Sequence, residues 1–162
     1  MIMASKLAGK LAAHAIWSLS DEGMLTPMFG FTDEHGKLTM ERFIAESFED
    51  SVLQGREKLS ENPMDATDAV LIYDGRITVG GEKIDAVIIE LRAYFSPTSQ
   101  AAFAVPYRPA TPGPFRVHRP QLLEWKNCED FDTDHALESF FDGVDSHSEG
   151  SKVWKAALDA SM

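Results

Sequence analysis

The strongest constraint on the fold is a regular alternation of apolar and polar side chains between residues 69 and 107. In the longest such segment, 85–95, one set of alternate positions holds Val87, Ile89, Leu91, Ala93 and Phe95, and the other holds Ile88, Glu90, Arg92 and Tyr94. Successive side chains of a strand point to opposite faces, so this pattern predicts one core face and one partly polar face. Similar segments at 69–73, 76–79 and 101–107 predict neighbouring strands. We expect an antiparallel sheet of about five to six strands, joined as hairpins in a meander.

Two glycine-containing dipeptides predict reversals of the chain. Asp74-Gly75 lies between the segments 69–73 and 76–79. Asp-Gly suits the positive φ angles of a type I′ turn, which predicts a two-residue hairpin at this point. Gly80-Gly81 predicts a second reversal before the long strand. An earlier strand is expected at 25–32, where Pro27 favours a sheet edge or a strand end.

The clearest predicted helix covers residues 40–60. Its apolar residues Phe43, Ile44, Phe48 and Val52 recur at spacings of three and four, Thr39 is the expected N-cap, and Asn62-Pro63 ends the helix. Further helices are expected over about the first fifteen residues, at 136–143 and at 151–160, whereas residues 14–19 fit either a helix or a strand. We predict a single α+β domain, 1–162, with helices packed mainly on one face of the sheet.

The charge of the chain limits its partners. Its 162 residues carry a net charge of −11, with 26 acidic against 15 basic residues. Binding to nucleic acid normally needs a clustered basic surface, so we expect no nucleic-acid partner. An acidic surface suits a basic protein partner, or it serves solubility alone. Because symmetric self-association is common among intracellular proteins, we also expect a homodimer or higher homo-oligomer.

The same sequence bears on location and cofactors. Cys128 is the one cysteine, which excludes an internal disulfide and a cysteine-rich zinc site and fits a reducing compartment. Lys10 interrupts the first apolar run, so no signal peptide is expected. No stretch reaches the roughly 18 apolar residues of a membrane span. We therefore expect a soluble cytoplasmic protein without a membrane partner. No phosphate-binding glycine loop, nucleophile elbow or metalloprotease motif is present, and no cofactor is expected.

A cluster of basic residues interrupts this acidic chain between positions 107 and 119. We call it the basic island, and it consists of Tyr107, Arg108, Arg116, His118 and Arg119. Arginine pairs a carboxylate or phosphate through two parallel hydrogen bonds. On a strand, the two-residue spacing of Arg116 and His118 would place both on one face. The basic island is therefore the predicted site for a small anionic ligand. The alternative is that its arginines pair with the protein's own carboxylates.

Two other groups of residues carry weaker signals. Glu90 and Arg92 beside Tyr94 fit a base held in a pocket, or an ion pair of little energetic weight. An acidic segment holds Cys128, Glu129, Asp130, Asp132, Asp134, His135, Asp142, Asp145 and His147. Its spacing matches no calcium loop. A transition-metal site built on His135 and His147 competes there with a charged, solvated loop, and we assign no metal.

The leading hypothesis for function is a non-enzymatic binding or protein-interaction domain, because no catalytic signature is present. The rival hypothesis is a small-molecule enzyme or an anion-binding protein that uses the basic island, with Glu90 or a later carboxylate. Convergence of these groups in one deep pocket favours the enzyme, and their dispersal over the surface favours the binding domain.

Overall fold

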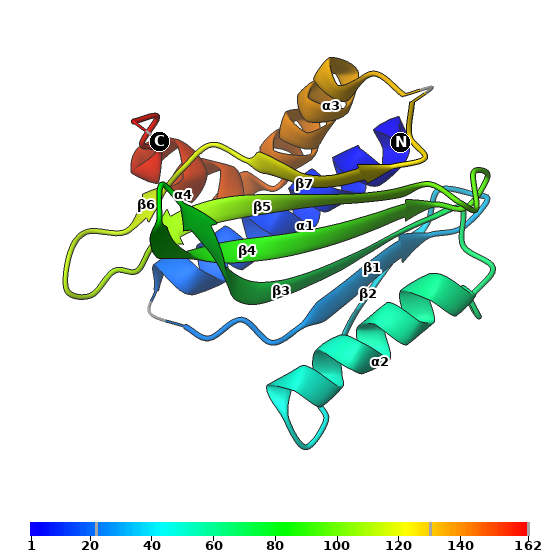
Figure 1. Ribbon diagram of the computed structural model, residues 1–162, viewed down its shortest axis with the longest axis horizontal. Coiled ribbons are helices and arrows are strands. Elements are labelled where there is room, and N and C mark those ends of the chain that lie inside the picture. Colours follow the sequence, from blue (N-terminus) through cyan, green and yellow to red (C-terminus); the bar gives the residue numbers. More distant parts are fainter. Residues whose placement is uncertain (22, 130, 162) are drawn as a thin grey trace.

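The computed structural model describes residues 1–21, 23–129 and 131–161, which form an α+β fold (Figure 1). The described strands make one antiparallel sheet in the order β2-β1-β3-β4-β5-β6, and β7 pairs with β5. The strands are β1 (Met28–Thr32), β2 (Leu38–Arg42), β3 (Asp68–Val79), β4 (Glu82–Ala93), β5 (Gln100–Arg108), β6 (Arg116–Val117) and β7 (Gln121–Lys126). The helices are α1 (Ile2–Ser20), α2 (Phe48–Glu61), α3 (Thr133–Ser146) and α4 (Ser148–Ala157). The predicted fold class is confirmed.

The main core lies between the sheet and α1. Helix α1 runs along one face of the sheet, and α3 and α4 pack against it (Figure 1). Ile72 of β3 and Ile89 of β4 share one buried cluster with Ile16 of α1, Phe140 of α3 and Trp154 of α4. Because α1 meets the sheet on one side and helices on the other, most of its circumference is apolar. Residues 14–19, which fit a helix or a strand by pattern, form the last part of this helix.

A smaller core lies on the opposite face of the sheet, under α2. Leu59 of this helix is buried with Phe29 of β1 and with Ala69 and Leu71 of β3. Since α1, α3 and α4 lie on the other face, the described helices are mainly on one face, as predicted.

The predicted helix 40–60 is wrong over its first part. Residues 38–42 form β2, which pairs with β1, and the helix begins only after Ser47. The hydroxyl of Ser47 accepts the backbone N–H of Asp50 at 3.1 Å, so Ser47 is the N-cap in place of Thr39. Strand β2 lies at the edge of the sheet with largely exposed side chains. Its sequence therefore lacks the alternation that buried strands show.

The predicted hairpin turn at Asp74-Gly75 is also wrong. Both residues lie inside β3 and pair with β4. The chain reverses at Gly80-Gly81, where φ is 58° and 82°. Asp74 is held in the strand by the hydroxyl of Tyr107, which donates to its Oδ1 at 2.7 Å. The pairing of the long β3–β4 ladder and this side-chain contact outweigh the local preference of Asp-Gly for a turn.

The remaining boundaries differ by a few residues. Strand β1 begins at Met28, three residues after the predicted start at 25. Helices α3 and α4 each begin three residues before the predicted start. Over the described residues, no helix combines the length and apolarity needed to cross a membrane.

Candidate functional site

The basic island lies at one end of the sheet. There the β3–β4 hairpin, the loop between β5 and β6 and the end of α1 come together (left side of Figure 1). A cavity of about 330 Å³, which we call the basic cavity, opens at this end. Its lining comprises Lys83, Ile84, Asp85, Tyr107, Arg108, Pro109, Pro112, Gly113, Pro114 and Arg116. The prolines of the β5–β6 loop restrict its backbone, which favours a preformed wall.

Three cations line the basic cavity without a carboxylate partner among the described residues: Lys83, Arg108 and Arg116. Arg108 of β5 and Arg116 of β6 stand directly opposite each other in the antiparallel register. Like charges in this position destabilise a sheet. The Arg116 guanidinium donates from Nη1 to the carbonyl of Phe115 at 3.0 Å, and this hydrogen bond to a neutral group does not neutralise its charge. An anion between the strands would relieve the repulsion.

The nearest acids leave this positive charge largely uncompensated. Asp85 lines the basic cavity but accepts a bond from Arg76 Nε at 3.3 Å. The pKa of Asp159 is lowered, first by hydrogen bonds from Ser161 and further by the charges of His118 and Arg116. No ion pair joins Asp159 to Arg116 within the described chain. The basic cavity thus has more positive than negative charge in its wall.

A larger cavity of about 680 Å³ adjoins the basic cavity, and we call it the mixed cavity. Its lining comprises Leu19, Gly23, Met24, Leu25, Phe48, Asp74, Gly75, Arg76, Asp85, Tyr107, Pro109, Ala110 and Thr111. The two cavities share Asp85, Tyr107 and Pro109. Burial raises the pKa of Asp74, and the hydrogen bond from Tyr107 opposes this shift. Burial and the neighbouring Asp74 raise the pKa of Tyr107, so its hydroxyl stays a donor.

The other members of the basic island lie away from these cavities. His118 is 1% exposed, and its Nδ1 lies 3.2 Å from the carbonyl oxygen of Asp159. Its Nε2 has no hydrogen-bond partner among the described residues. Arg119 is exposed and lines neither cavity. The structure therefore brings Tyr107, Arg108 and Arg116 together and separates His118 and Arg119 from them.

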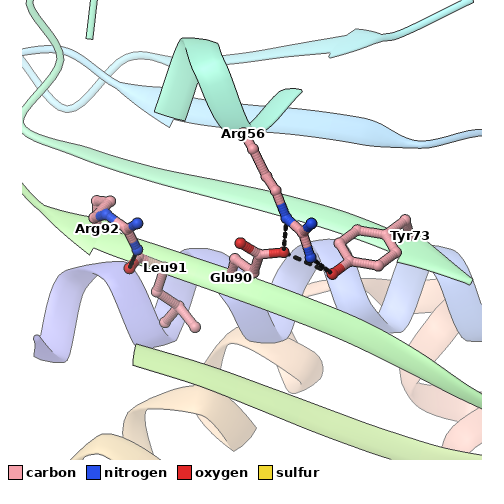
Figure 2. A network of polar contacts seen from close by, with 5 residues as sticks. All are labelled: Arg56, Tyr73, Glu90, Leu91 and Arg92. Carbon is pink, nitrogen blue, oxygen red and sulfur yellow. Dashed lines mark hydrogen bonds and ion pairs between the residues drawn. The ribbon is translucent and has the colours of Figure 1, made fainter. Parts of the chain in front are cut away.

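Glu90 belongs to a different network, shown in Figure 2. Arg56 of α2 donates to its Oε2 through Nε at 2.9 Å, and the hydroxyl of Tyr73 donates to the same oxygen at 2.6 Å. Arg56 also donates to the Tyr73 hydroxyl at 2.7 Å. The expected pair of Glu90 with Arg92 is wrong, because the Nη1 of Arg92 donates to the carbonyl of Leu91 at 3.1 Å instead.

This network fixes α2 to the sheet. Burial first, and then Glu90, raise the pKa of Tyr73. Tyr94, the third member of the predicted group, donates its hydroxyl to the carbonyl of Leu59 at 2.6 Å, and burial raises its pKa to about 12. The bonds of Arg56 and Leu59 connect α2 with β3, β4 and the segment after β4, and the bond between Tyr73 and Glu90 connects β3 with β4. Glu90 and Arg92 both line a cavity of about 330 Å³, but Oε2 of Glu90 already accepts two hydrogen bonds from side chains of the protein. We therefore interpret Glu90 as a structural residue.

The acidic segment does not gather into a metal site. Over the described residues, no three His, Cys, Asp or Glu side chains are grouped as a metal ion would require. His135 pairs with Asp132 at 3.7 Å, whereas His147 approaches His14 of α1. Asp130 lies outside the described residues.

The contact between His14 and His147 has a defined proton arrangement. His147 is the N-cap of α4, and its Nδ1 accepts the backbone N–H of Gly150 at 2.9 Å. The proton of neutral His147 is then on Nε2, which lies 3.2 Å from Nδ1 of His14. A proton added to Nδ1 of His14 would face this N–H, so protonation of His14 breaks the hydrogen bond between the two rings.

We expect the free energy of unfolding to fall as the pH drops through about 6.5, the ordinary histidine pKa. Burial, followed by the charges of His147 and Arg42, lowers the pKa of His14 in the folded protein. The unfolded state then binds more protons over this range, so stability rises with pH and is lost below it. Urea unfolding at about pH 7.5 and about pH 5.5 measures this difference. His14→Gln should reduce it, and His35→Gln, at an exposed position, should not. An unchanged difference in His14→Gln contradicts the assignment.

In comparisons with known proteins, no protein-family model, curated protein or solved structure matches this chain. The proposals below therefore rest on the geometry of the site.

Proposed function

We propose that this chain is a non-enzymatic binding domain whose ligand carries an anionic group, held at the basic cavity. The observation that carries the proposal is the directly opposed pair Arg108 and Arg116, joined at the cavity wall by Lys83. A folded chain keeps two adjacent guanidinium groups at an energetic cost unless an anion compensates them. Carboxylate and phosphate oxygens match the guanidinium fork, which makes these groups the best candidates.

The positions of the proton-transfer groups support binding over catalysis. The rival enzyme hypothesis uses the basic island, which includes His118, together with Glu90 or a later carboxylate. His118 is buried behind β6 against Asp159, and Glu90 is engaged by Arg56 and Tyr73. Cys128 is fully buried, and burial raises its pKa, which disfavours the reactive thiolate. These groups are dispersed, as the binding hypothesis requires.

The net charge of the chain makes the local excess of cations informative. A protein with a charge of −11 repels anions at long range. In a chain with so many acids, chance placement would put a carboxylate beside most cations. Lys83, Arg108 and Arg116 nevertheless line one cavity without a carboxylate partner among the described residues. The alternative is that the arginines of the basic island pair with the protein's own carboxylates. It explains Arg108 and Arg116 less well than a bound anion does, because neither forms an ion pair with a described carboxylate.

Inorganic phosphate should stabilise the wild-type protein in a saturable way. At a concentration about tenfold above Kd, binding to the folded state alone adds about 1.4 kcal/mol. For a chain of this size, that corresponds to a rise in Tm of about 3–6 °C. Thermal unfolding in increasing phosphate, at ionic strength held constant with chloride, separates a site from general salt screening. Arg116→Ala should remove the shift.

Arg119→Ala is the matched control, because it also deletes one guanidinium but at an exposed position outside both cavities. It should keep the full shift. A response that does not saturate, or an equal response in Arg116→Ala and Arg119→Ala, overturns the proposal.

The expected homodimer and the expected basic protein partner stay predictions from the sequence. Light scattering at micromolar concentration, with and without phosphate, tests self-association independently of the cavity.

A further inference from the structure

The two adjoining cavities offer charges of opposite sign to one ligand. Arg108 and Arg116 line only the basic cavity, whereas Asp74 lines only the mixed cavity. Asp85, Tyr107 and Pro109 line both, so the cavities are neighbours that meet at these residues. Arg76 of the mixed cavity and the shared Asp85 form an ion pair with each other. A ligand that extends from one cavity to the other therefore meets cations outside any described ion pair at one end and the carboxylate of Asp74 at the other.

Asp74 has acceptor capacity left for a ligand. It accepts the Tyr107 hydroxyl at 2.7 Å, and no described cation lies within ion-pair distance of it. A carboxylate offers about four lone-pair sites, so donors on a ligand still find acceptors there. An ammonium group is the donor that gains most, because its bonds to a carboxylate are charge-assisted.

The mixed cavity also has an apolar part to its wall. Leu19, Met24, Leu25 and Phe48 line the mixed cavity, and Met24 is 93% exposed while Phe48 is 43% exposed. Exposed apolar side chains that border a cavity are typical of ligand sites. A ligand that reaches Asp74 can therefore place an apolar side chain in the mixed cavity.

We infer that the two cavities form one site for a short peptide with free ends, whose carboxylate binds beside Arg108 and Arg116 and whose ammonium binds beside Asp74. This inference rests on the proposed anion-binding function. A free amino acid carries both charges on one carbon, whereas the site places the charges that are outside any described ion pair, those of Arg108 and Arg116 and that of Asp74, in different cavities. A peptide separates them by about 3.3–3.6 Å for each extended residue and supplies the apolar side chain.

Calorimetric titration with the tripeptide Ala-Leu-Ala, its N-acetylated form and its C-terminal amide tests the inference on the wild-type protein. Each modification removes one charge and should weaken binding by about ten- to a hundredfold. Asp74→Asn retains an acceptor for Tyr107 while losing the charge. In this variant, acetylation of the peptide should change Kd by less than about twofold, because the charge that the ammonium meets is gone.

The outcomes separate this inference from the proposed function. If the free and acetylated peptides bind equally while amidation abolishes binding, the peptide inference is overturned and the anion site stands. If the C-terminal amide binds as well as the free peptide, the inference is overturned, because the peptide carboxylate then makes no contact with Arg108 and Arg116 that contributes to binding. If neither a peptide nor inorganic phosphate binds the wild-type protein, both the inference and the proposed function are overturned.

Discussion

Replacing Gly9 by alanine should destabilise the protein by about 3 kcal/mol, although the same change in an exposed helix would stabilise it by roughly 0.5–1 kcal/mol. A Cβ added at Gly9 of α1 would overlap the backbone carbonyl of Phe140 in α3. Reciprocally, a Cβ at Gly143 of α3 would overlap the carbonyl of Lys6 in α1. The two helices therefore touch backbone to backbone, and a methyl group fits only if they move apart. Such a movement would loosen the packing of both helices over the core.

Gly55→Ala in α2 is the matched control for this prediction. A Cβ there meets Cδ1 of Leu71 at 2.5 Å, the end of a side chain that can change its rotamer. We expect its cost to stay below about 1 kcal/mol. Urea unfolding of the two variants gives both free energies. Equal effects at Gly9 and Gly55 would show that α1 and α3 are not in backbone contact.

Phe140→Ala should cost about 3–5 kcal/mol, a large part of the roughly 5–15 kcal/mol that stabilise a typical protein. Its ring is fully buried. The centroid of this ring lies 5.8 Å from the ring centroid of Phe103 on β5, 5.4 Å from that of Phe141 and 6.0 Å from that of Trp154 of α4. Removing it opens a cavity where the sheet, α3 and α4 meet, and the loss of three edge-to-face contacts adds to the lost burial.

Phe95→Ala makes the same chemical change at a side chain that is 73% exposed. The centroid of its ring lies 5.8 Å from the centroid of the Phe131 ring. Because most of the Phe95 side chain is in solvent, the substitution should cost less than about 1 kcal/mol of the free energy of unfolding. The midpoint and slope of urea unfolding distinguish the two variants. A cost below about 2 kcal/mol for Phe140→Ala contradicts the central role given to this ring.

Much of the sheet could be predicted from sequence, because its central strands are buried enough to show an alternating pattern. The segment 85–95 corresponds closely to β4. The edge strand β2 was missed, since its exposed side chains follow no such pattern. The predicted turn at Asp74-Gly75 is wrong because the turn preference of Asp-Gly is local, whereas pairing with β4 keeps both residues inside β3. The glycines that do reverse the chain, at 80 and 81, also carried a turn signal.

The candidate site was only partly predictable. Arg108 and Arg116 belong to the predicted basic island, because three arginines and a histidine within thirteen positions are conspicuous in an acidic chain, and both line the basic cavity. Lys83 and Asp74 were missed, since the residues of β4 and β5 separate them in sequence from the basic island. Placing the turn at Gly80-Gly81 would have put Lys83 at the end of a hairpin, and this signal could have suggested its role.

By itself, the sequence determined the elements whose side-chain periodicity repeats within one segment: the central strands and the amphipathic part of α2. Strand and helix patterns are local properties, because the backbone geometry repeats every two or about 3.6 residues. The tertiary structure alone decided which charged groups meet. It paired Glu90 with Arg56 from α2 instead of Arg92 on its own strand, and it opposed Arg108 to Arg116. Residues two apart on a strand stand side by side, whereas partners across strands and layers depend on register and packing that no short segment encodes.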